Sequence, residues 1–294
     1  MDLHGVCVIS LTPFSATGEV DGASLCTLTD FYLQAGVHGI VLLGIMGEAN
    51  KLTEPERDVV VDTVVQRVGG QVPVVVGVSA AGTRIAQFYA RRAEHLGANA
   101  VMLAPPTNVR NLDLVLHHYQ AVGETTPLAL VVQDEPSSTG VNLPPGFFAR
   151  VANEVPTARY AKLEEPPTPV KISAIETLVP HHYRMFGGLG GMYFYEELGR
   201  GAVGVMTGFA YPEVLVQVYE HFAAGSREEA REIFYRYLPL IRFEAQLGVS
   251  GVAIRKQVYQ SRGVIASSHV RSPAPTGDEH TRDELADMIQ YFRL

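Results

Sequence analysis

Lys162 is the residue of this sequence best placed to carry chemistry. The chain has 294 residues and only four lysines, and Lys162 lies in the segment ARYAKLEE, where Tyr160, Lys162 and Glu164 occupy every second position. In a β-strand these three side chains share one face. On the dehydrated inner face of a barrel, a lysine amine is favoured in its neutral form, which attacks a carbonyl carbon to form a Schiff base. The alternative is a lysine at a strand end that only pairs with Glu164 or Glu165.

Glu164 is the predicted partner of Lys162 in proton transfer. Once a Schiff base has formed with a 2-oxo acid, a proton must leave C3 of the substrate, and this step needs a group within hydrogen-bond reach. Glu164 follows Lys162 by two residues on the same face and meets that requirement. We therefore expect both residues to be catalytic, with a purely structural ion pair as the alternative.

The segment GIMGE is a candidate binding site for an anion. Gly44 and Gly47 flank Ile45 and Met46 at the end of an apolar run. Glycines at this spacing let backbone N–H groups turn inward and hold an anion such as a carboxylate, although they can also serve only a tight turn. We expect Glu48, the last residue of the segment, to hold this loop, with a catalytic role as the alternative.

Eight short apolar segments predict the strands that position these residues, and amphipathic segments such as 54–67, 83–96, 112–122 and 212–223 predict helices between them. Eight strands, each followed by a helix, predict a (β/α)8 TIM barrel, in which catalytic side chains lie at the carboxyl ends of the strands. The predicted strands are residues 7–11, 39–44, 72–78, 99–105, 128–133, 158–164, 183–188 and 202–207.

The last part of the chain follows a different pattern. From Ser226 onward the sequence is helical in character, and a Pro-rich joint precedes the final helix, whose entry is marked by Thr276, Gly277 and Asp278. We therefore predict a catalytic barrel domain over residues 1–225 and a C-terminal extension of three helices over residues 226–294. Such an extension packs on the barrel or on a neighbouring subunit.

Composition excludes several classes of function. The net charge is 23 − 31 = −8, which argues against a nucleic-acid partner. Two cysteines, Cys7 and Cys26, are too few for a disulfide scaffold or a Cys-based zinc site, and neither an HxH strand motif nor an HExxH helix occurs, so we expect no metal. No apolar run is long enough to cross a bilayer, and we see no signal peptide, so we expect a cytoplasmic protein.

The order of five segments identifies a family resemblance. HGVCVISLTPF, GIVLLGIMGE, NAVMLAPP, EPSSTGVNLP and ARYAKLEE resemble the dihydrodipicolinate synthase and N-acetylneuraminate lyase superfamily over essentially the whole barrel. The resemblance implies a class I lyase or dehydratase that forms a Schiff base with pyruvate or another 2-oxo acid. It implies Lys162 as the Schiff-base lysine and GIMGE as the loop that holds the substrate carboxylate. It also implies a homotetramer, while the lysine imine itself replaces any metal or organic cofactor.

Three departures from the family pattern argue against a synthase. Ile45 and Met46 stand where the family usually has hydroxyl or small residues, Gln133 stands where it has a tyrosine that relays protons, and Ser138 stands where the synthase has an arginine. The Lys162-x-Glu164 arrangement is instead similar to that of the superfamily's 2-keto-3-deoxy sugar acid dehydratases.

Further residues at predicted strand ends are candidates for binding the substrate. We expect Gln133 to orient it, and Gly188, in the run GGLGG, to let the backbone approach its hydroxyl groups. We expect Met206 and Thr207 to lie beside the pocket, with Thr207 as a hydroxyl ligand. Asp134 and Glu135 are further candidates for contact with a polyhydroxylated substrate.

The function predicted from these residues is a lyase that forms a Schiff base with a small 2-oxo acid. Its reaction is dehydration or retro-aldol cleavage of a 2-keto-3-deoxy sugar acid. One alternative is an aldolase or synthase that condenses pyruvate with an aldehyde. The other is a non-catalytic protein that binds a 2-oxo acid but has lost its proton relay at Ile45, Met46 and Gln133.

Overall fold

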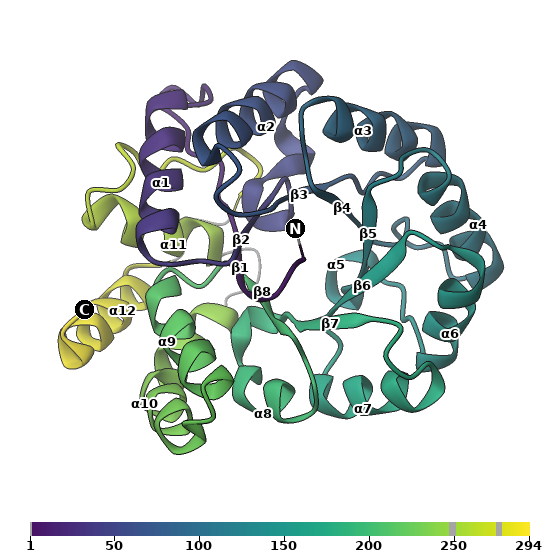
Figure 1. Cartoon of the computed structure of the whole chain (residues 1–294). Helices are drawn as coiled ribbons and strands as arrows, with labels where there is room; N and C mark the ends of the chain where they lie inside the picture. The colour runs from purple at the N-terminus through teal and green to yellow at the C-terminus, as the bar shows by residue number, and fades with distance from the viewer. Residues whose placement is uncertain (1, 247–250, 275–277) are drawn as a thin grey trace.

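Eight parallel strands form a closed barrel in the computed structural model, which describes residues 2–246, 251–274 and 278–294 (Figure 1). Each strand pairs with the next one in the sequence, and β8 closes the barrel by pairing with β1. All eight predicted strands are present, displaced by at most two residues at either end, so the predicted (β/α)8 fold is confirmed. The strands are β1 Gly5–Ile9, β2 Gly39–Leu42, β3 Val74–Gly77, β4 Ala100–Leu103, β5 Ala129–Asp134, β6 Ala158–Leu163, β7 Arg184–Gly187 and β8 Gly204–Thr207.

Helices connect successive strands and surround the barrel (Figure 1). The start of the second helix shows how local signals fix these elements, because the Thr53 N–H donates to Glu56 Oε2 at 2.8 Å and Pro55 occupies the first turn. The helices of the barrel are α1 Gly22–Gln34, α2 Glu54–Val68, α3 Thr83–His95, α4 Leu112–Gly123, α6 Pro145–Glu154, α7 Thr168–Leu178, α8 Phe194–Gly199 and α9 Pro212–Ala223, with the short α5 Pro136–Thr139 and the 3₁₀ turns η1 Ile45–Gly47, η2 Ala49–Lys51 and η3 Leu189–Gly191.

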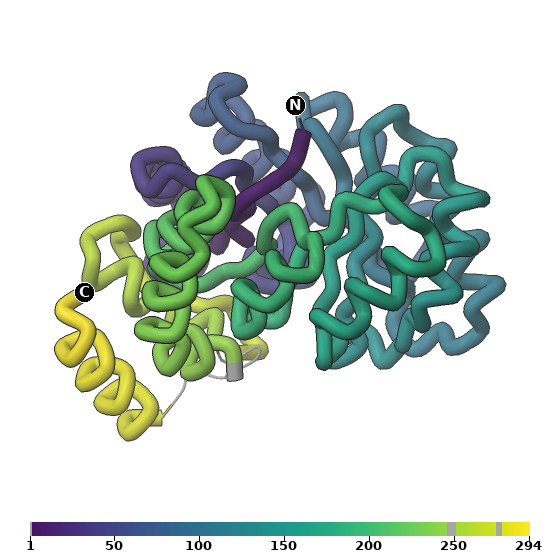
Figure 2. Tube along the Cα trace, turned by 60° about the horizontal axis from the view of Figure 1, so that its bottom comes forward, coloured from purple at the N-terminus to yellow at the C-terminus, as the bar shows by residue number. Residues whose placement is uncertain are grey.

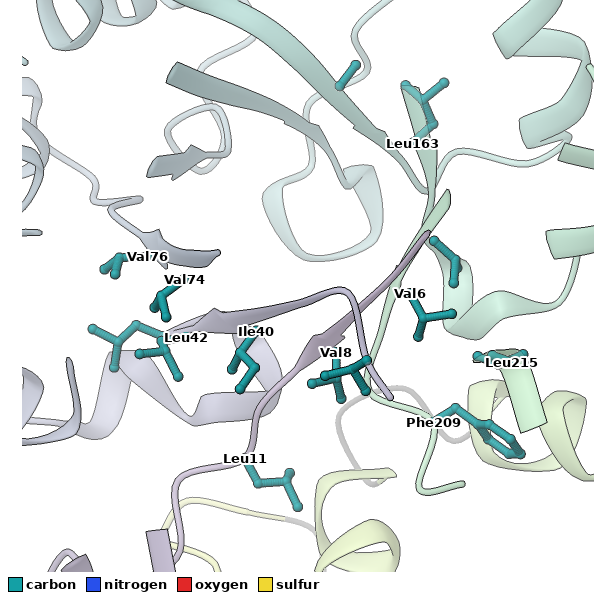
Figure 3. Packing of buried hydrophobic residues seen from close by; sticks show 14 of the residues in the cluster. Val6, Val8, Leu11, Ile40, Leu42, Val74, Val76, Leu163, Phe209 and Leu215 are labelled. Carbon is teal, nitrogen blue, oxygen red and sulfur yellow. The ribbon is translucent and has the colours of Figure 1, made fainter. Parts of the chain in front are cut away.

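The strands bury apolar side chains on both faces. On the outer face, residues such as Val6, Val8, Ile40 and Leu42 pack toward the helices (Figure 3). Side chains of the opposite parity fill the barrel, and the two sets form separate clusters because successive side chains of a strand point to opposite faces. The inner cluster is Leu3, Cys7, Ile9, Val41, Val75, Ala100, Met102, Val131, Tyr160, Phe186 and Met206.

Three further helices, α10 Arg227–Gln246, α11 Gly251–Ser261 and α12 Glu279–Phe292, lie on one side of the barrel (Figures 1 and 2). Helix α11 packs against α1 through Tyr259, whose ring centroid lies 5.8 Å from that of Phe31. The boundary predicted at residues 225 and 226 falls between α9 and α10, and the division into two domains stays a prediction.

The predicted entry to the last helix lies only partly in the described structure. Asp278 caps α12 by accepting a hydrogen bond from the Thr281 N–H at 2.8 Å. Thr276 and Gly277 lie outside the described residues. Across the part of the chain that the structure describes, no helix is both long and apolar enough to cross a bilayer.

Candidate active site

A large cavity opens at the carboxyl ends of the strands. Its volume is about 810 Å³, and its wall combines loops that follow β2, β3, β4 and β5 with part of the C-terminal extension. Gly44, Ile45, Glu48 and Gln133 are on this wall, together with Ser272 from beyond α11. The GIMGE segment and the end of β5, which are far apart in the sequence, therefore share one cavity at the barrel end where the fold places catalytic groups.

Lys162 lies beside this cavity, on the inner face of β6. Its side chain is almost fully buried, and in the sheet register it lies between Gln133 of β5 and Phe186 of β7. Gln133 is on the cavity wall, and Lys162 is its neighbour on the adjacent strand. Phe186 has no exposed surface and gives the lysine an apolar neighbour. Sequence reasoning missed Phe186, although its place two residues before Gly188 put it on the same strand face.

Glu164 contacts both Lys162 and Gln133, and the sequence predicted only the first of these contacts. Its Oε2 lies 2.9 Å from Lys162 Nζ and accepts a hydrogen bond from Gln133 Nε2 at 3.0 Å. Lys162 and Glu164 therefore lie on one face, as their spacing predicted. Gln133 was expected to orient the substrate, and its amide orients the Glu164 carboxylate.

Gly188 makes room for this carboxylate. A Cβ atom at Gly188 would lie 2.3 Å from Glu164 Cγ, which is closer than real Cβ contacts allow. At the preceding Gly187, a Cβ atom would lie 1.6 Å from Glu197 Oε2. The two glycines at the end of β7 thus leave space for one carboxyl group each. This steric reason differs from the approach of the backbone to substrate hydroxyl groups that the sequence suggested.

The GIMGE segment folds as the 3₁₀ turn η1. The N–H groups of Gly47 and Glu48 donate to Gly44 O and Ile45 O at 3.1 and 3.0 Å. The N–H groups of Ile45 and Met46 begin the turn and have no acceptor within it. Gly44 places the turn above the barrel interior, because a Cβ atom there would lie 3.3 Å from Ile9 Cγ2. The turn thus has two backbone donors available for an anion.

Glu48 is buried and directed toward the C-terminal extension. Its Oε1 lies 2.6 Å from Lys256 Nζ, and its Oε2 lies 2.9 Å from Lys51 Nζ and accepts from the Arg271 N–H at 3.0 Å. Burial lowers the pKa of Lys256 to about 8, against the opposing effect of Glu48. With both oxygens engaged, Glu48 holds the loop. Because Lys256 is far from Glu48 along the chain, the sequence alone could not predict this ion pair.

Asp134 corrects an expectation. Asp134 follows the inward Gln133 and points outward, where it has no exposed surface and lies 2.7 Å from Lys171 Nζ. Burial raises the pKa of Asp134 to about 6, and the Lys171 charge opposes that shift. Glu135 accepts a hydrogen bond from the Ser138 N–H at 2.9 Å at the start of α5. Asp134 points away from the barrel interior and is paired with Lys171, which corrects the expected contact of Asp134 with a substrate. The expected contact of Glu135 stays a prediction.

Met206 and Thr207 have opposite orientations. Met206 belongs to the inner cluster of the barrel, as a residue beside the site should. Thr207 follows it and therefore points toward the surrounding helices, next to Gly191. This corrects the expectation of Thr207 as a hydroxyl ligand, because the alternation of the strand turns its side chain away from the barrel interior.

Comparison with known proteins agrees with this geometry. A sequence profile of the dihydrodipicolinate synthetase family matches residues 2–292. The chain is 32% identical over 287 residues to L-2-keto-3-deoxyarabonate dehydratase from Azospirillum brasilense, which covers 96% of this chain and 92% of that protein. It is 30% identical over 293 residues to 4-hydroxy-tetrahydrodipicolinate synthase from Thermotoga petrophila, which covers 98% of both chains.

Solved structures show the same relationship. The crystal structure of dihydrodipicolinate synthase from Rhodopseudomonas palustris superposes with a TM-score of 0.92 at 33% sequence identity, over 98% of this chain and 97% of that one. A putative dihydrodipicolinate synthetase from Pseudomonas aeruginosa superposes with a TM-score of 0.90 at 27% identity, over 98% and 99% of the two chains. Because the profile spans both the barrel and the helical extension, the chain is a lyase that belongs to the dihydrodipicolinate synthetase family.

Proposed function

We propose that this protein dehydrates a 2-keto-3-deoxy sugar acid through a Schiff base on Lys162. The observation that carries the proposal is the position of the Glu164 carboxylate, 2.9 Å from Lys162 Nζ and 3.0 Å from Gln133 Nε2. The 32% identity to an L-2-keto-3-deoxyarabonate dehydratase supports the same class of substrate.

The residues present account for each step of the reaction. The Lys162 amine attacks C2 of the substrate, and loss of the ketone oxygen as water leaves a protonated imine. Glu164 then removes a proton from C3, and the electrons of that bond move to the imine nitrogen as an enamine forms. The enamine expels the C4 hydroxyl group, which leaves as water with the proton that Glu164 removed from C3. Another water molecule then hydrolyses the imine to release the product and regenerate the amine. The imine accepts the electrons in this sequence, so no further electron acceptor is required.

The cavity wall offers partners for both the carboxylate and the hydroxyl groups of such a substrate. The backbone N–H groups of Ile45 and Met46 are available for the substrate carboxylate at η1. Hydroxyl side chains of Ser79 and Thr107 stand on the same wall, where sugar hydroxyl groups need hydrogen-bond partners. A polyhydroxylated chain with one terminal carboxylate fits this distribution of polar groups.

Trapping of the imine tests the assignment of Lys162. The protein is incubated with pyruvate or a 2-keto-3-deoxy pentonate, reduced with borohydride, and digested for mass spectrometry. We expect a stable adduct on Lys162 alone. In the control variant Lys162→Arg, the positive charge beside Glu164 is kept but an imine cannot form, so no adduct is expected. A wild-type protein that gives no adduct with any 2-oxo acid would contradict the proposal.

The role of Glu164 is tested separately from that of the lysine. The variant Glu164→Gln keeps the shape of the side chain but removes the base, so we expect turnover to fall by about 10²- to 10⁴-fold. The adduct on Lys162 should still form. Turnover equal to that of the wild type would remove Glu164 from the proton transfer and leave the lysine assignment intact.

An aldolase of the synthase type is a second candidate, because the synthase from Thermotoga petrophila is 30% identical to this chain. The products distinguish the two reactions. A dehydratase keeps the carbon chain intact, whereas retro-aldol cleavage releases pyruvate, which a coupled assay with lactate dehydrogenase detects. An adduct without turnover of any substrate would favour a protein that only binds 2-oxo acids.

A homotetramer and a cytoplasmic location remain predictions of the family resemblance and of the sequence. Light scattering of the purified protein gives the mass of the assembly in solution. Fractionation of cells that express the gene gives its location.

A further inference from the structure

The C-terminal extension places two adjacent cations against the GIMGE loop. Arg255 and Lys256, both on α11, contact Met46 and Glu48 across more than two hundred residues of sequence. Lys256 Nζ lies 2.6 Å from Glu48 Oε1 and donates to His269 O at 2.9 Å, and it also lies over the Phe14 ring, 4.2 Å from its centroid. Arg255 is different, because its Nε alone donates to a carboxylate among the described residues, while its Nη1 contacts only a thioether sulfur.

We propose that Arg255 binds the carboxylate of the 2-oxo acid substrate, together with the backbone N–H groups of Ile45 and Met46. This inference rests on the proposed function, since it assigns a ligand to the anionic end of that substrate. It makes the helical extension part of the active site rather than only a support for the barrel.

The hydrogen bonds of Arg255 leave donors free. Its Nε donates to Glu244 Oε2 at 2.9 Å, and its Nη1 lies 3.1 Å from Met46 Sδ. A thioether sulfur is a weak acceptor, and a guanidinium carries five N–H donors. Among the described residues Nη2 has no acceptor. The residue as a whole is 5% exposed, so the guanidinium is held in place by the protein around it.

The contact with Met46 places Arg255 beside the turn at the barrel mouth. The Met46 side chain that it contacts packs against the inner cluster of the barrel and crosses the end of β8, where a Cβ atom at Gly208 would lie 3.0 Å from Met46 Cγ. The free N–H of Met46 belongs to the same residue. Arg255 therefore borders the turn that presents the two available backbone donors.

The loop by itself offers a carboxylate only backbone donors. The side chains of Ile45 and Met46 cannot donate hydrogen bonds, and two backbone N–H groups alone compensate poorly for burying a carboxylate. The protein also carries a net charge of −8, which opposes the approach of an anion. A guanidinium offers parallel donors that match the two oxygens of a carboxylate.

Glu244 holds Arg255 from the opposite side. It has no exposed surface, and its Oε2 also accepts from the Ala210 N–H at 3.1 Å. Because the carboxylate pairs with Nε, it fixes the arginine without occupying Nη2. The substrate carboxylate, a stronger acceptor, would then replace Met46 Sδ as the partner of Arg255 Nη1.

The test compares a charged probe with a neutral one. Borohydride trapping is measured over a range of concentrations of pyruvate and of methyl pyruvate, which has the same ketone but no carboxylate. For Arg255→Gln we expect the half-saturating concentration of pyruvate to rise by about 10- to 100-fold, as expected when a hydrogen bond to a charged group is lost. That of methyl pyruvate should stay unchanged. For Arg255→Lys, which keeps the charge and the ion pair with Glu244, we expect a smaller rise with pyruvate only.

Arg262→Gln is the matched control. Arg262 lies just beyond the end of α11 and donates to Ala210 O, but it pairs with Glu213 on the outer side, so both probes should behave as in the wild type. Equal weakening of both probes in the Arg255 variants would show a purely structural role and overturn the proposal, as would unchanged trapping of pyruvate. A wild-type protein that traps neither probe would instead contradict the proposed function.

Discussion

Each of the four lysines pairs with a carboxylate near the barrel mouth. Lys51 and Lys256 share Glu48, while Lys162 pairs with Glu164 on the inner face of β6. Lys171 pairs with Asp134 on the outer face of the barrel, and with Glu165. Burial alone therefore does not mark a catalytic lysine in this protein. Lys162 differs from the others because its amine lies on the inner face, next to the cavity.

Lys171 provides a prediction at the level of single residues. Replacing it in Lys171→Met leaves the buried Asp134 without a cation, and removal of one partner of a buried ion pair costs about 3–5 kcal/mol. We therefore expect the free energy of unfolding to fall by about that amount in urea denaturation at pH 7. Asp134 adjoins Gln133 and Glu165 adjoins Glu164, so the loss of Lys171 should also disturb the hydrogen bond between Gln133 and Glu164. We therefore expect turnover to fall as well.

Two further variants test whether the unpaired Asp134 charge causes this loss of stability. The double variant Lys171→Met with Asp134→Asn removes the unpaired charge and should recover part of the lost stability. Arg150→Met breaks the exposed pair with Asp113 and should cost less than about 1 kcal/mol, because surface pairs contribute little. A loss in Lys171→Met no larger than that of Arg150→Met would contradict this account.

At the level of elements, the end of β7 shows why a strand end carries consecutive glycines. Gly187 and Gly188 lie between two carboxyl groups, with Glu197 behind the strand and Glu164 in front of it. The hydrogen bond from the Gly188 N–H to Leu163 O at 2.8 Å fixes this strand end against β6. A side chain here cannot be accommodated unless a carboxyl group moves.

Gly188→Ala is therefore expected to displace Glu164. The added methyl group would lie 2.3 Å from Glu164 Cγ in the present geometry, so the carboxylate must leave its position beside Lys162. Since small misplacements of catalytic groups are costly, we expect kcat to fall by about 10- to 100-fold. Borohydride trapping on Lys162 should persist. Gly199→Ala, at a position where a Cβ atom meets nothing within 4 Å, should keep full activity. A kcat unchanged in Gly188→Ala would show that Glu164 tolerates displacement.

At the level of the whole molecule, one buried carboxyl group makes stability depend on pH. Glu197 of α8 has no exposed surface and accepts a hydrogen bond from Thr168 Oγ1 of α7 at 2.5 Å. Burial raises its pKa from 4.5 to about 8, with the nearby Glu196 and Glu164 adding to the effect. The folded protein therefore holds this proton more tightly than the unfolded chain does. Stability should fall as the pH rises from about 4.5 to about 8.

Glu197→Gln removes this dependence because glutamine resembles the protonated acid. Wild type and variant should be similarly stable at pH 5. At pH 8.5 or above the variant should be more stable, by a few kcal/mol, since each pKa unit corresponds to about 1.4 kcal/mol. Urea denaturation over this range measures the difference. The exposed Glu232→Gln is the control and should follow the wild type. Parallel pH profiles of Glu197→Gln and wild type would contradict the prediction.

The sequence by itself determined the features that depend on local spacing. Short apolar segments separated by helical segments predicted eight strands in order, and eight successive strand–helix units are typical of a closed barrel. The spacing of Lys162 and Glu164 placed both on one face of β6, because strand periodicity requires no knowledge of neighbouring strands.

Tertiary structure decided which face of each strand is inward and which distant groups meet. Barrel strands are apolar on both faces, so the pattern could not show that Gln133 points inward while Asp134 and Thr207 point outward. Contacts such as Arg255 with Met46 join residues 209 positions apart, and nothing in local composition encodes them. Only the closed barrel, with α11 packed beside its mouth, brings the two cations of the extension to the GIMGE loop.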